Sequence, residues 1–391
     1  MGDAALKELS VGPLSGVRTI EFAGIGPGPF CGMMLADMGA DVLRVDRPGS
    51  GEEGPIDPRL DLLNRGKRSV VLDLKSPRGT DAALRLCASA DLLIEGFRPG
   101  VMERLGLAPE RCFEQNPRLV YGRVTGFGQE GPLAGAPGHD INYISLSGAL
   151  HAIGAPDRPS IPLNLLADFG GGGMLLAFGL LCGLIESRRS GKGQVVDAAM
   201  IDGVSALLTP IYGMMRMGFW RDERGANLLD GASPFYNVYE TADGKWISIG
   251  PLEPRFCAEL LRKMGLDPEA FAPQLDAAQW PSWKERLAAA FRTRTRAEWC
   301  ATLEGSDACA TPVLSLREVP QHPQQRERGS IIEVEGVQQP APAPRFSRTP
   351  GRVRGPPPLP GEGAAQALLD WGFAPEQVAA LGLEVVKGEA G

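Results

Sequence analysis

The sequence is poor in histidine and in aromatic residues, and it lacks closely spaced cysteines. It has three histidines, 6% aromatic residues and an odd number of cysteines, none of them in the C-x-x-C pairs of zinc or redox sites. The cysteines are Cys31, Cys87, Cys112, Cys182, Cys257, Cys300 and Cys309. We therefore expect no metal site, and reduced thiols as in a cytosolic protein.

An excess of positive charge is also absent. The formal net charge is -7 at pH 7, so the chain carries no wide basic field of the kind that nucleic-acid phosphates require. Nucleic acid is therefore not an expected partner, and a phosphate-bearing ligand would have to meet local arginines.

Long apolar segments are absent as well. The longest apolar run, residues 174–185, is shorter than the ~20 residues of a membrane-spanning helix. Residues 1–10 carry acids and no apolar core, unlike a signal peptide, and residues 388–391 lack a peroxisomal Ser-Lys-Leu signal. We expect a cytoplasmic protein without membrane insertion.

What the chain does contain is an alternation of short apolar strands and helical segments over its first half. With 391 residues there is room for two domains, and the alternation predicts an α/β fold whose large domain has a parallel, Rossmann-like sheet. The expected strands are residues 17–22, 42–46, 69–74, 92–94, 119–124 and 194–198, and the main expected helices are residues 30–38, 79–90 and 171–188.

A second, smaller α+β domain is expected where a strand pair around residues 241–244 precedes amphipathic helices. A proline-rich stretch at 338–363 predicts an extended connection, with a recognition peptide as the alternative. The predicted parts are the large domain 1–200, linker helices 201–234, the small domain 235–315, a linker 316–345 and a C-terminal return to the large domain 346–391.

Three glycines after the first strand, Gly24, Gly26 and Gly28, imitate a dinucleotide-binding fingerprint, with Asp46 beyond them. The third glycine of a true fingerprint would stand at position 29, where Pro29 lacks the amide donor that a phosphate needs. We therefore interpret the glycines as a tight turn at a sheet edge that can receive the nucleotide part of a ligand.

Several runs of residues resemble the family III CoA-transferases, and residues 138–143 and 164–172 resemble their α-methylacyl-CoA racemase branch in particular. The transferases share Asp168 but usually lack His139. The matching runs are residues 26–31, 35–40, 45–49, 65–69, 72–75, 95–100, 125–128, 296–299 and 311–313. The resemblance implies a Rossmann-like domain made from both chain ends, a small domain, and an interlocked homodimer with active sites between domains of different subunits.

The activity that the resemblance implies is epimerisation of 2-methylacyl-CoA thioesters through an enolate, with no cofactor, since CoA is part of the substrate. Removing a weakly acidic α-proton requires a base and a way to hold the enolate oxygen, and inversion requires an acid on the other face. We expect His139 and Asp168 to be this pair, because histidine titrates near neutrality and burial can tune a carboxyl. By resemblance, Glu253 of the small domain orients His139.

Each of these residues has a simpler alternative. His139 could be a structural histidine, Glu253 could be solvated surface, and Asp168 could be the N-cap of the helix that follows it. For Asp168 the two roles are compatible, because glycines 170–173 would line a helix start whose free amides could hold the enolate oxygen.

The remaining site residues follow from the resemblance, and arginines suit the phosphates of CoA. The residues assigned to the CoA thioester are Arg47, Val71, Leu72, Asp73, Leu74, Glu95, Arg98, Arg104, Gly138, Asp140 and Tyr143. A flexible acyl pocket or simple packing explains Met200, Met214, Met215, Met217 and Trp220 equally well. The rival function is CoA transfer with Asp168 as the nucleophile, and a non-catalytic CoA-binding scaffold is the third reading.

Overall fold

The computed structural model describes residues 12–50 and 57–383, which form two compact units. The large unit combines the chain up to Ser147, residues 163–207 and the chain from Gly329 onward, and the small unit combines residues 148–162 and 208–328. The features expected at residues 1–10 and 388–391 lie outside the described residues.

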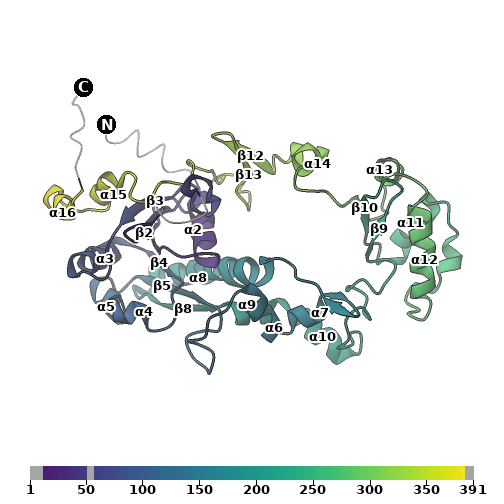
Figure 1. The fold of residues 1–391 in the computed structure, drawn as a ribbon, viewed down its shortest axis with the longest axis horizontal. Helices are drawn as coiled ribbons and strands as arrows, with labels where there is room; N and C mark the ends of the chain where they lie inside the picture. Colours follow the sequence, from purple (N-terminus) through teal and green to yellow (C-terminus); the bar gives the residue numbers. More distant parts are fainter. Residues whose placement is uncertain (1–11, 51–56, 384–391) are drawn as a thin grey trace. The chain divides into compact units, whose positions relative to one another are not determined.

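The centre of the large unit is a six-stranded, all-parallel sheet in the order β3-β2-β1-β4-β5-β8 (Figure 1). The strands are β1 (Arg18–Phe22), β2 (Asp41–Asp46), β3 (Arg68–Val71), β4 (Leu92–Glu95), β5 (Val120–Thr125) and β8 (Gln194–Ala199). The predicted α/β class and parallel sheet are confirmed. The strand order reverses between β1 and β4, and open α/β sheets bind ligands at such a point.

Alternating side chains of β1 separate the two faces of the sheet. Ile20 and Phe22 join the main apolar core, whereas Glu21 points to the opposite face and lies against Gly32 of the first helix. The helices on the core side are α3 (Pro77–Ser89), α4 (Val101–Arg104), α5 (Pro109–Gln115), α15 (Ala364–Asp370) and α16 (Pro375–Ala380), and those on the other face are α2 (Pro27–Asp37) and α8 (Leu175–Ser190). The helices α15 and α16 near the C-terminus thus pack in the large unit.

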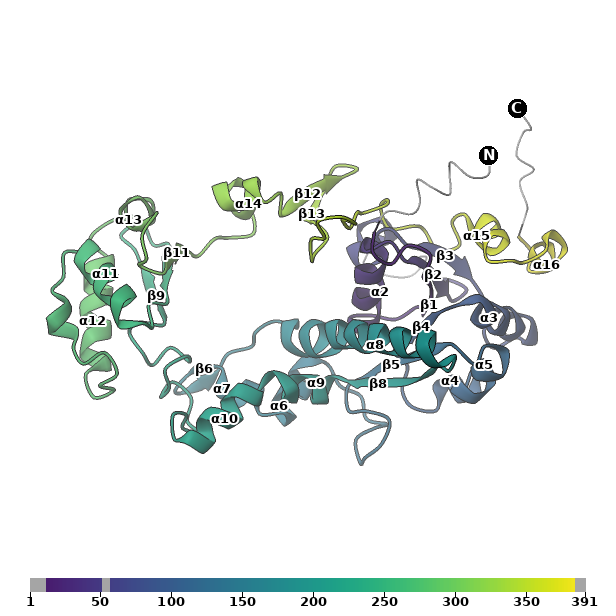
Figure 2. The same ribbon diagram turned by 180° about the vertical axis from the view of Figure 1, so that it is seen from behind.

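The longest helical segment joins a π-helix, η3 (Leu165–Met174), to α8, which lies along β5 and β8 (Figure 2). Leu180 of α8 packs directly on the backbone of β5 because Gly122 has no side chain, and a Cβ added at Gly122 would lie 2.8 Å from Leu180. Among the described residues, this 26-residue segment is long and apolar enough to cross a membrane. Its most apolar stretch of 18 residues has a mean hydropathy of 1.7, and 39% of that stretch is buried in the protein. The length argument from residues 174–185 was wrong, since the helix extends beyond both ends of that run.

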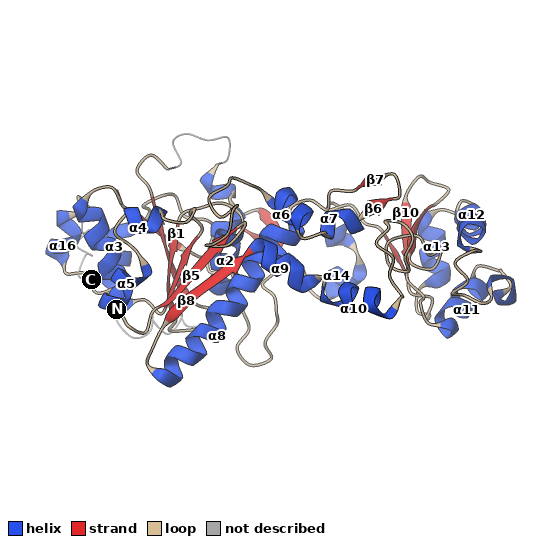
Figure 3. Cartoon of the chain, turned by 90° about the horizontal axis from the view of Figure 1, so that it is seen from below, coloured by secondary structure: helices blue, strands red, loops and turns tan. Residues whose placement is uncertain are grey.

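The small unit is built on an antiparallel sheet, β11-β10-β9, with helices beside it (Figure 3). An aromatic core holds it together, in which Tyr239 stacks on Phe291 at 5.1 Å and Trp299 meets Phe291 edge-on at 5.2 Å. The strands are β9 (Asn237–Glu240), β10 (Trp246–Ile249) and β11 (Ala310–Pro312), and the helices include α10 (Thr209–Met217), α11 (Pro254–Lys263), α12 (Trp280–Phe291), α13 (Arg296–Leu303) and α14 (Pro323–Glu327). The hairpin and the α+β character were predicted.

The boundaries between the units differ from those predicted. Residues 148–162, with the helix α7 (Ala149–Ala152), join the small unit, because Arg224 donates hydrogen bonds to the carbonyls of His151 and Ala155. Residues 329–345, predicted to be linker, belong to the large unit and form the hairpin β12 (Ile331–Val334) and β13 (Val337–Pro340). The Arg224 contacts join residues 69 and 73 positions apart in the sequence, so local patterns do not reveal them.

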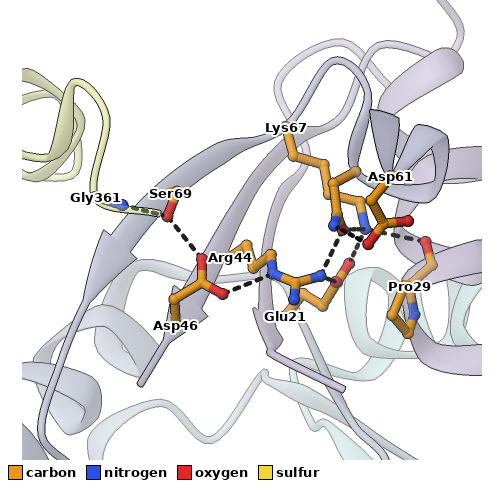
Figure 4. Close-up of polar contacts among 9 residues, drawn as sticks. Glu21, Pro29, Arg44, Asp46, Asp61, Lys67, Ser69 and Gly361 are labelled. Atoms are coloured by element: carbon orange, nitrogen blue, oxygen red, sulfur yellow. Dashed lines mark hydrogen bonds and ion pairs between the residues drawn. The ribbon is translucent and has the colours of Figure 1, made fainter. Parts of the chain in front are cut away.

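A buried ion pair supports the start of α2. The Lys67 ammonium donates to Glu21 Oε2 at 2.6 Å, to the Pro29 carbonyl at 3.0 Å and to Asn64 Oδ1 at 3.2 Å, and neither side chain of the ion pair has solvent exposure (Figure 4). Burial lowers the pKa of Lys67, and Glu21 opposes that shift. The pair therefore ties β1 and the chain before β3 to the first turn of α2.

The same network reaches the C-terminal segment. The Gly361 amide donates to Ser69 Oγ at 2.8 Å, and Ser69 donates to Asp46 Oδ2 at 2.7 Å (Figure 4). Arg44 then joins Asp46 Oδ1, at 3.0 Å, to Glu21 Oε1, at 3.5 Å. The segment around Gly361 is thereby fixed to β3, next to the end of β2.

Replacing Lys67 with methionine should destabilise the large unit, because the Glu21 carboxylate would stay buried without its ammonium partner. Removing one partner of a buried ion pair typically costs about 3–5 kcal/mol, which urea unfolding would measure. The control is Lys192→Met at an exposed position. Combining Lys67→Met with Glu21→Gln should recover part of the loss, and a Lys67→Met loss no larger than that of the control would contradict the role of the pair.

Candidate active site

A cavity of about 1880 Å³ opens at the carboxyl edge of the parallel sheet. Its wall contains residues at or after the ends of all six strands, as expected for an open α/β sheet. These are residues 22–29, 44–50, 72–75, 96–99, 124–127 and Met200. The rest of the wall comes from residues 137–139, Asn142, Tyr143, Asn164, Asp168, Pro358, Pro360 and a few neighbours.

The glycine-rich turn after β1 forms one part of this wall. Gly26 has a positive φ of 70° and precedes the first residue of α2, which supports the prediction of a tight turn. A Cβ added at Gly26 would lie only 3.4 Å from Asp168 Oδ2. The turn is therefore in close contact with the predicted catalytic carboxylate.

Asp168 lies in the first turn of the π-helix η3, and its carboxylate reaches the cavity wall. Asn164, the residue before the helix, donates from Nδ2 to Asp168 Oδ2 at 3.0 Å. The N-cap is thus Asn164 and not Asp168, so capping of its own helix does not explain the aspartate. π-helical turns are rare and are frequent at functional sites.

The electrostatic environment of Asp168 favours its protonated form. Burial raises the pKa of its carboxyl above the ordinary value, and the charge of Asp140 raises it further, whereas Asn164 and His139 act to lower it. A carboxyl with a raised pKa can act as an acid near neutral pH as well as a base.

The glycines that follow Asp168 have a different role from the one predicted. Gly171, Gly172 and Gly173 are buried inside the helical segment, so they do not line an exposed helix start. A Cβ at Gly171 would lie 2.8 Å from the Val204 amide of α9 (Met200–Leu207), and one at Gly173 would lie 2.7 Å from Phe30 of α2. The glycines allow η3 to pack directly on both helices.

His139 is an exposed residue of the cavity wall and immediately precedes α6 (Asp140–Leu146). Its backbone amide donates to Asn142 Oδ1 at 3.0 Å, which fixes the chain where the helix begins. Because His139 acts on the pKa of Asp168 and both residues line one cavity, the structure brings the predicted acid–base pair together.

Tyr143 also belongs to the wall and is largely buried. Its ring meets Phe127 edge-on at 5.0 Å and lies so close to Gly126 and Gly138 that a Cβ at these positions would be 2.0 and 2.8 Å from Tyr143 Cε1. Burial, together with the charge of Asp168, raises the pKa of the phenol, so it stays a hydrogen-bond donor at neutral pH.

Glu95, predicted to contact the thioester, is not part of the wall. Its buried carboxylate accepts from Arg123 Nε at 2.8 Å and from the Phe97 amide at 2.8 Å. Burial raises the pKa of Glu95, and the bonds from Arg123 and Phe97 oppose this. Glu95 holds the loop of residues 96–99, which does line the cavity.

The other residues predicted to bind CoA divide into two groups. Those on the wall are Arg47, Leu72, Asp73, Leu74, Arg98, Gly138 and Tyr143. Val71, the exposed Arg104 of α4 and the buried Asp140 do not reach it. Four further wall residues, Lys75, Phe97, Asn142 and Asn164, stood in runs that match the family. The sequence did not single out Arg44, Pro358 or Pro360, and nothing local distinguished the prolines from a linker.

Glu253 belongs to the small unit, where it immediately precedes α11 and is exposed. Its predicted partnership with His139 stays a prediction. Met200 lines the cavity, whereas Met214, Met215, Met217 and Trp220 belong to the small unit. Within the described ranges, no three His, Cys, Asp or Glu side chains are grouped as a metal site would require.

Comparison with known proteins places this geometry in context. A family model described as CoA-transferase family III matches residues 14–364. The α-methylacyl-CoA racemases of mouse and human are 47% and 45% identical over 368 residues, which is 93% of this chain and 95% of each racemase. The crystal structure of a CAIB/BAIF family protein from Brucella suis matches with a TM-score of 0.78 and 28% identity, covering 92% of this chain and 100% of that one.

Proposed function

The chain belongs to CoA-transferase family III, and from that premise we propose that it is an isomerase that interconverts (R)- and (S)-2-methylacyl-CoA thioesters. The observation that carries the proposal is that His139 and Asp168 line one cavity. The chain that holds them is 45–47% identical to two racemases. Two groups able to exchange protons near neutral pH are what inversion of an α-carbon requires.

Epimerisation requires two proton transfers, one on each face of the α-carbon. One residue, neutral His139 or ionised Asp168, takes the α-proton, and the C–H electron pair moves into an enolate. The other residue, as imidazolium or carboxylic acid, returns a proton to the opposite face of the carbon. The raised pKa of Asp168 supports its acid role because the protonated carboxyl is then populated closer to neutral pH.

The cavity suits a long, phosphate-bearing thioester. Its volume of about 1880 Å³ exceeds the 300–1,000 Å³ that is typical of small-ligand pockets. Exposed Arg47, Lys75 and Arg98 on its wall are available to phosphates, while the phenol of Tyr143 lies beside the acid–base pair. CoA is part of the substrate, and the proposed reaction uses no further cofactor.

CoA transfer is the alternative within the same family. Asp168 would then attack the thioester carbonyl, forming an acyl–carboxylate anhydride and releasing the CoA thiolate. The racemase function is favoured because transfer gives no role to a second proton-exchanging residue at His139, and because the relatives at 45–47% identity are racemases.

We further propose that the chain is a cytoplasmic homodimer. The outer face of α8 exposes Phe178 by 66% and Ile185 by 70%, an apolar surface suited to a second copy. Ultracentrifugation of a cell extract should leave the chain in the supernatant, and sedimentation of the pure protein should give the mass of a dimer. Recovery with the membranes, or a monomer at micromolar concentration, would contradict this proposal.

Incubating one pure 2-methylacyl-CoA epimer with the chain in heavy water, with EDTA and no acceptor acid, should place deuterium on the α-carbon and produce the other epimer. Mass spectrometry and separation of the epimers measure both. A parallel reaction with a free carboxylic acid is the control for CoA transfer. If no label enters the α-carbon while CoA moves to the added acid, the transferase alternative is correct.

A further inference from the structure

We propose that Asp140 is a positioning residue that fixes His139 and Asp168 relative to one another and does not itself touch the substrate. The inference rests on the proposed proton transfer. It departs from the CoA-binding role implied by the resemblance, because the Asp140 side chain is not on the cavity wall and the residue is only 3% exposed.

The contacts of Asp140 reach both members of the pair. It directly follows His139 and is the first residue of α6. Its Oδ2 accepts from the backbone amides of Ala167 and Asp168, at 2.7 and 2.9 Å. The Asp140 carboxylate therefore connects the backbone next to His139 to the backbone of Asp168. The two amides that it binds are 27 and 28 positions away in the sequence.

These two amides need an outside partner. They lie in the first turn of η3, where backbone N–H groups have no carbonyl acceptor within the helix. A carboxylate is a strong acceptor there, because charge-assisted hydrogen bonds and the positive end of the helix dipole both favour it. Asp140 thus caps a helix from a distant part of the chain. It fixes the backbone position of Asp168, whose carboxylate lies against Gly26.

The charge of Asp140 has a second effect, which capping alone does not require. Its Oδ1 is buried with no hydrogen-bond partner among the described residues. The charge of Asp140 raises the pKa of Asp168. The other titratable groups that face Asp168 within the large unit are His139 and Tyr143. Asparagine could accept from the same amides, but it has no negative charge to add to the effect of burial, so the pKa of Asp168 would be raised less.

Two substitutions separate position from charge. Asp140→Ala removes the acceptor, so kcat for α-deuterium exchange should fall for both epimers by about 10²-fold, the effect of a displacement near 1 Å, with KM almost unchanged. Asp140→Asn should keep more activity. In the pH profile of kcat, the limb set by the ionisation of Asp168 is the one that is missing in Asp168→Ala. In Asp140→Asn this limb should move to lower pH, because removing a neighbouring negative charge lowers the pKa of Asp168.

The matched control is Asp81→Ala, an exposed aspartate on α3 outside the cavity, and urea unfolding verifies that each variant is folded. If Asp140→Ala keeps the wild-type kcat, if its loss lies only in KM, or if the limb does not move in Asp140→Asn, the inference is wrong. Asp140→Asn tests it even where Asp140→Ala fails to fold. A wild-type chain that exchanges no α-proton would contradict the proposed function itself, and this inference with it.

Discussion

The site depends on how closely the π-helical segment η3 can approach α2 and α9. The three buried glycines of that segment leave no room for a Cβ, so the backbones come into direct contact. This contact places Asp168 against the turn at Gly26, where the carboxyl is partly desolvated and its pKa rises. A larger side chain at Gly171 or Gly173 would have to displace the carboxylate together with its helix.

The parallel sheet supplies the rest of the site. Because all six strands point the same way, the chain leaves each strand at one edge, and residues from distant parts of the sequence line one cavity there. The buried pair of Lys67 and Glu21 holds the first turn of α2, and the bond from the Gly361 amide to Ser69 holds the C-terminal segment that brings Pro358 and Pro360 to the wall. Buried charged residues thus hold wall segments that are themselves uncharged, namely the first turn of α2 and the prolines near Gly361.

Sequence patterns predicted what local periodicity encodes and missed what distant contacts decide. The six strands of the parallel sheet and the hairpin of the small unit each have a local apolar pattern, so their existence and type could be predicted. The resemblance placed Glu95 and Asp140 at the ligand, but their carboxylates turn inward to Arg123 and to the Ala167 amide. Nothing within a few residues of Glu95 or Asp140 in the sequence indicates these partners.

The central claim is that two different residues exchange the α-proton, one from each face. The most direct measurement is α-deuteration of each pure epimer by His139→Ala and by Asp168→Ala. Each variant should lose exchange mainly from one epimer, with opposite preferences, and a positioned base typically contributes about 10²–10⁴-fold in rate. Near-normal exchange of both epimers by both variants would contradict the claim.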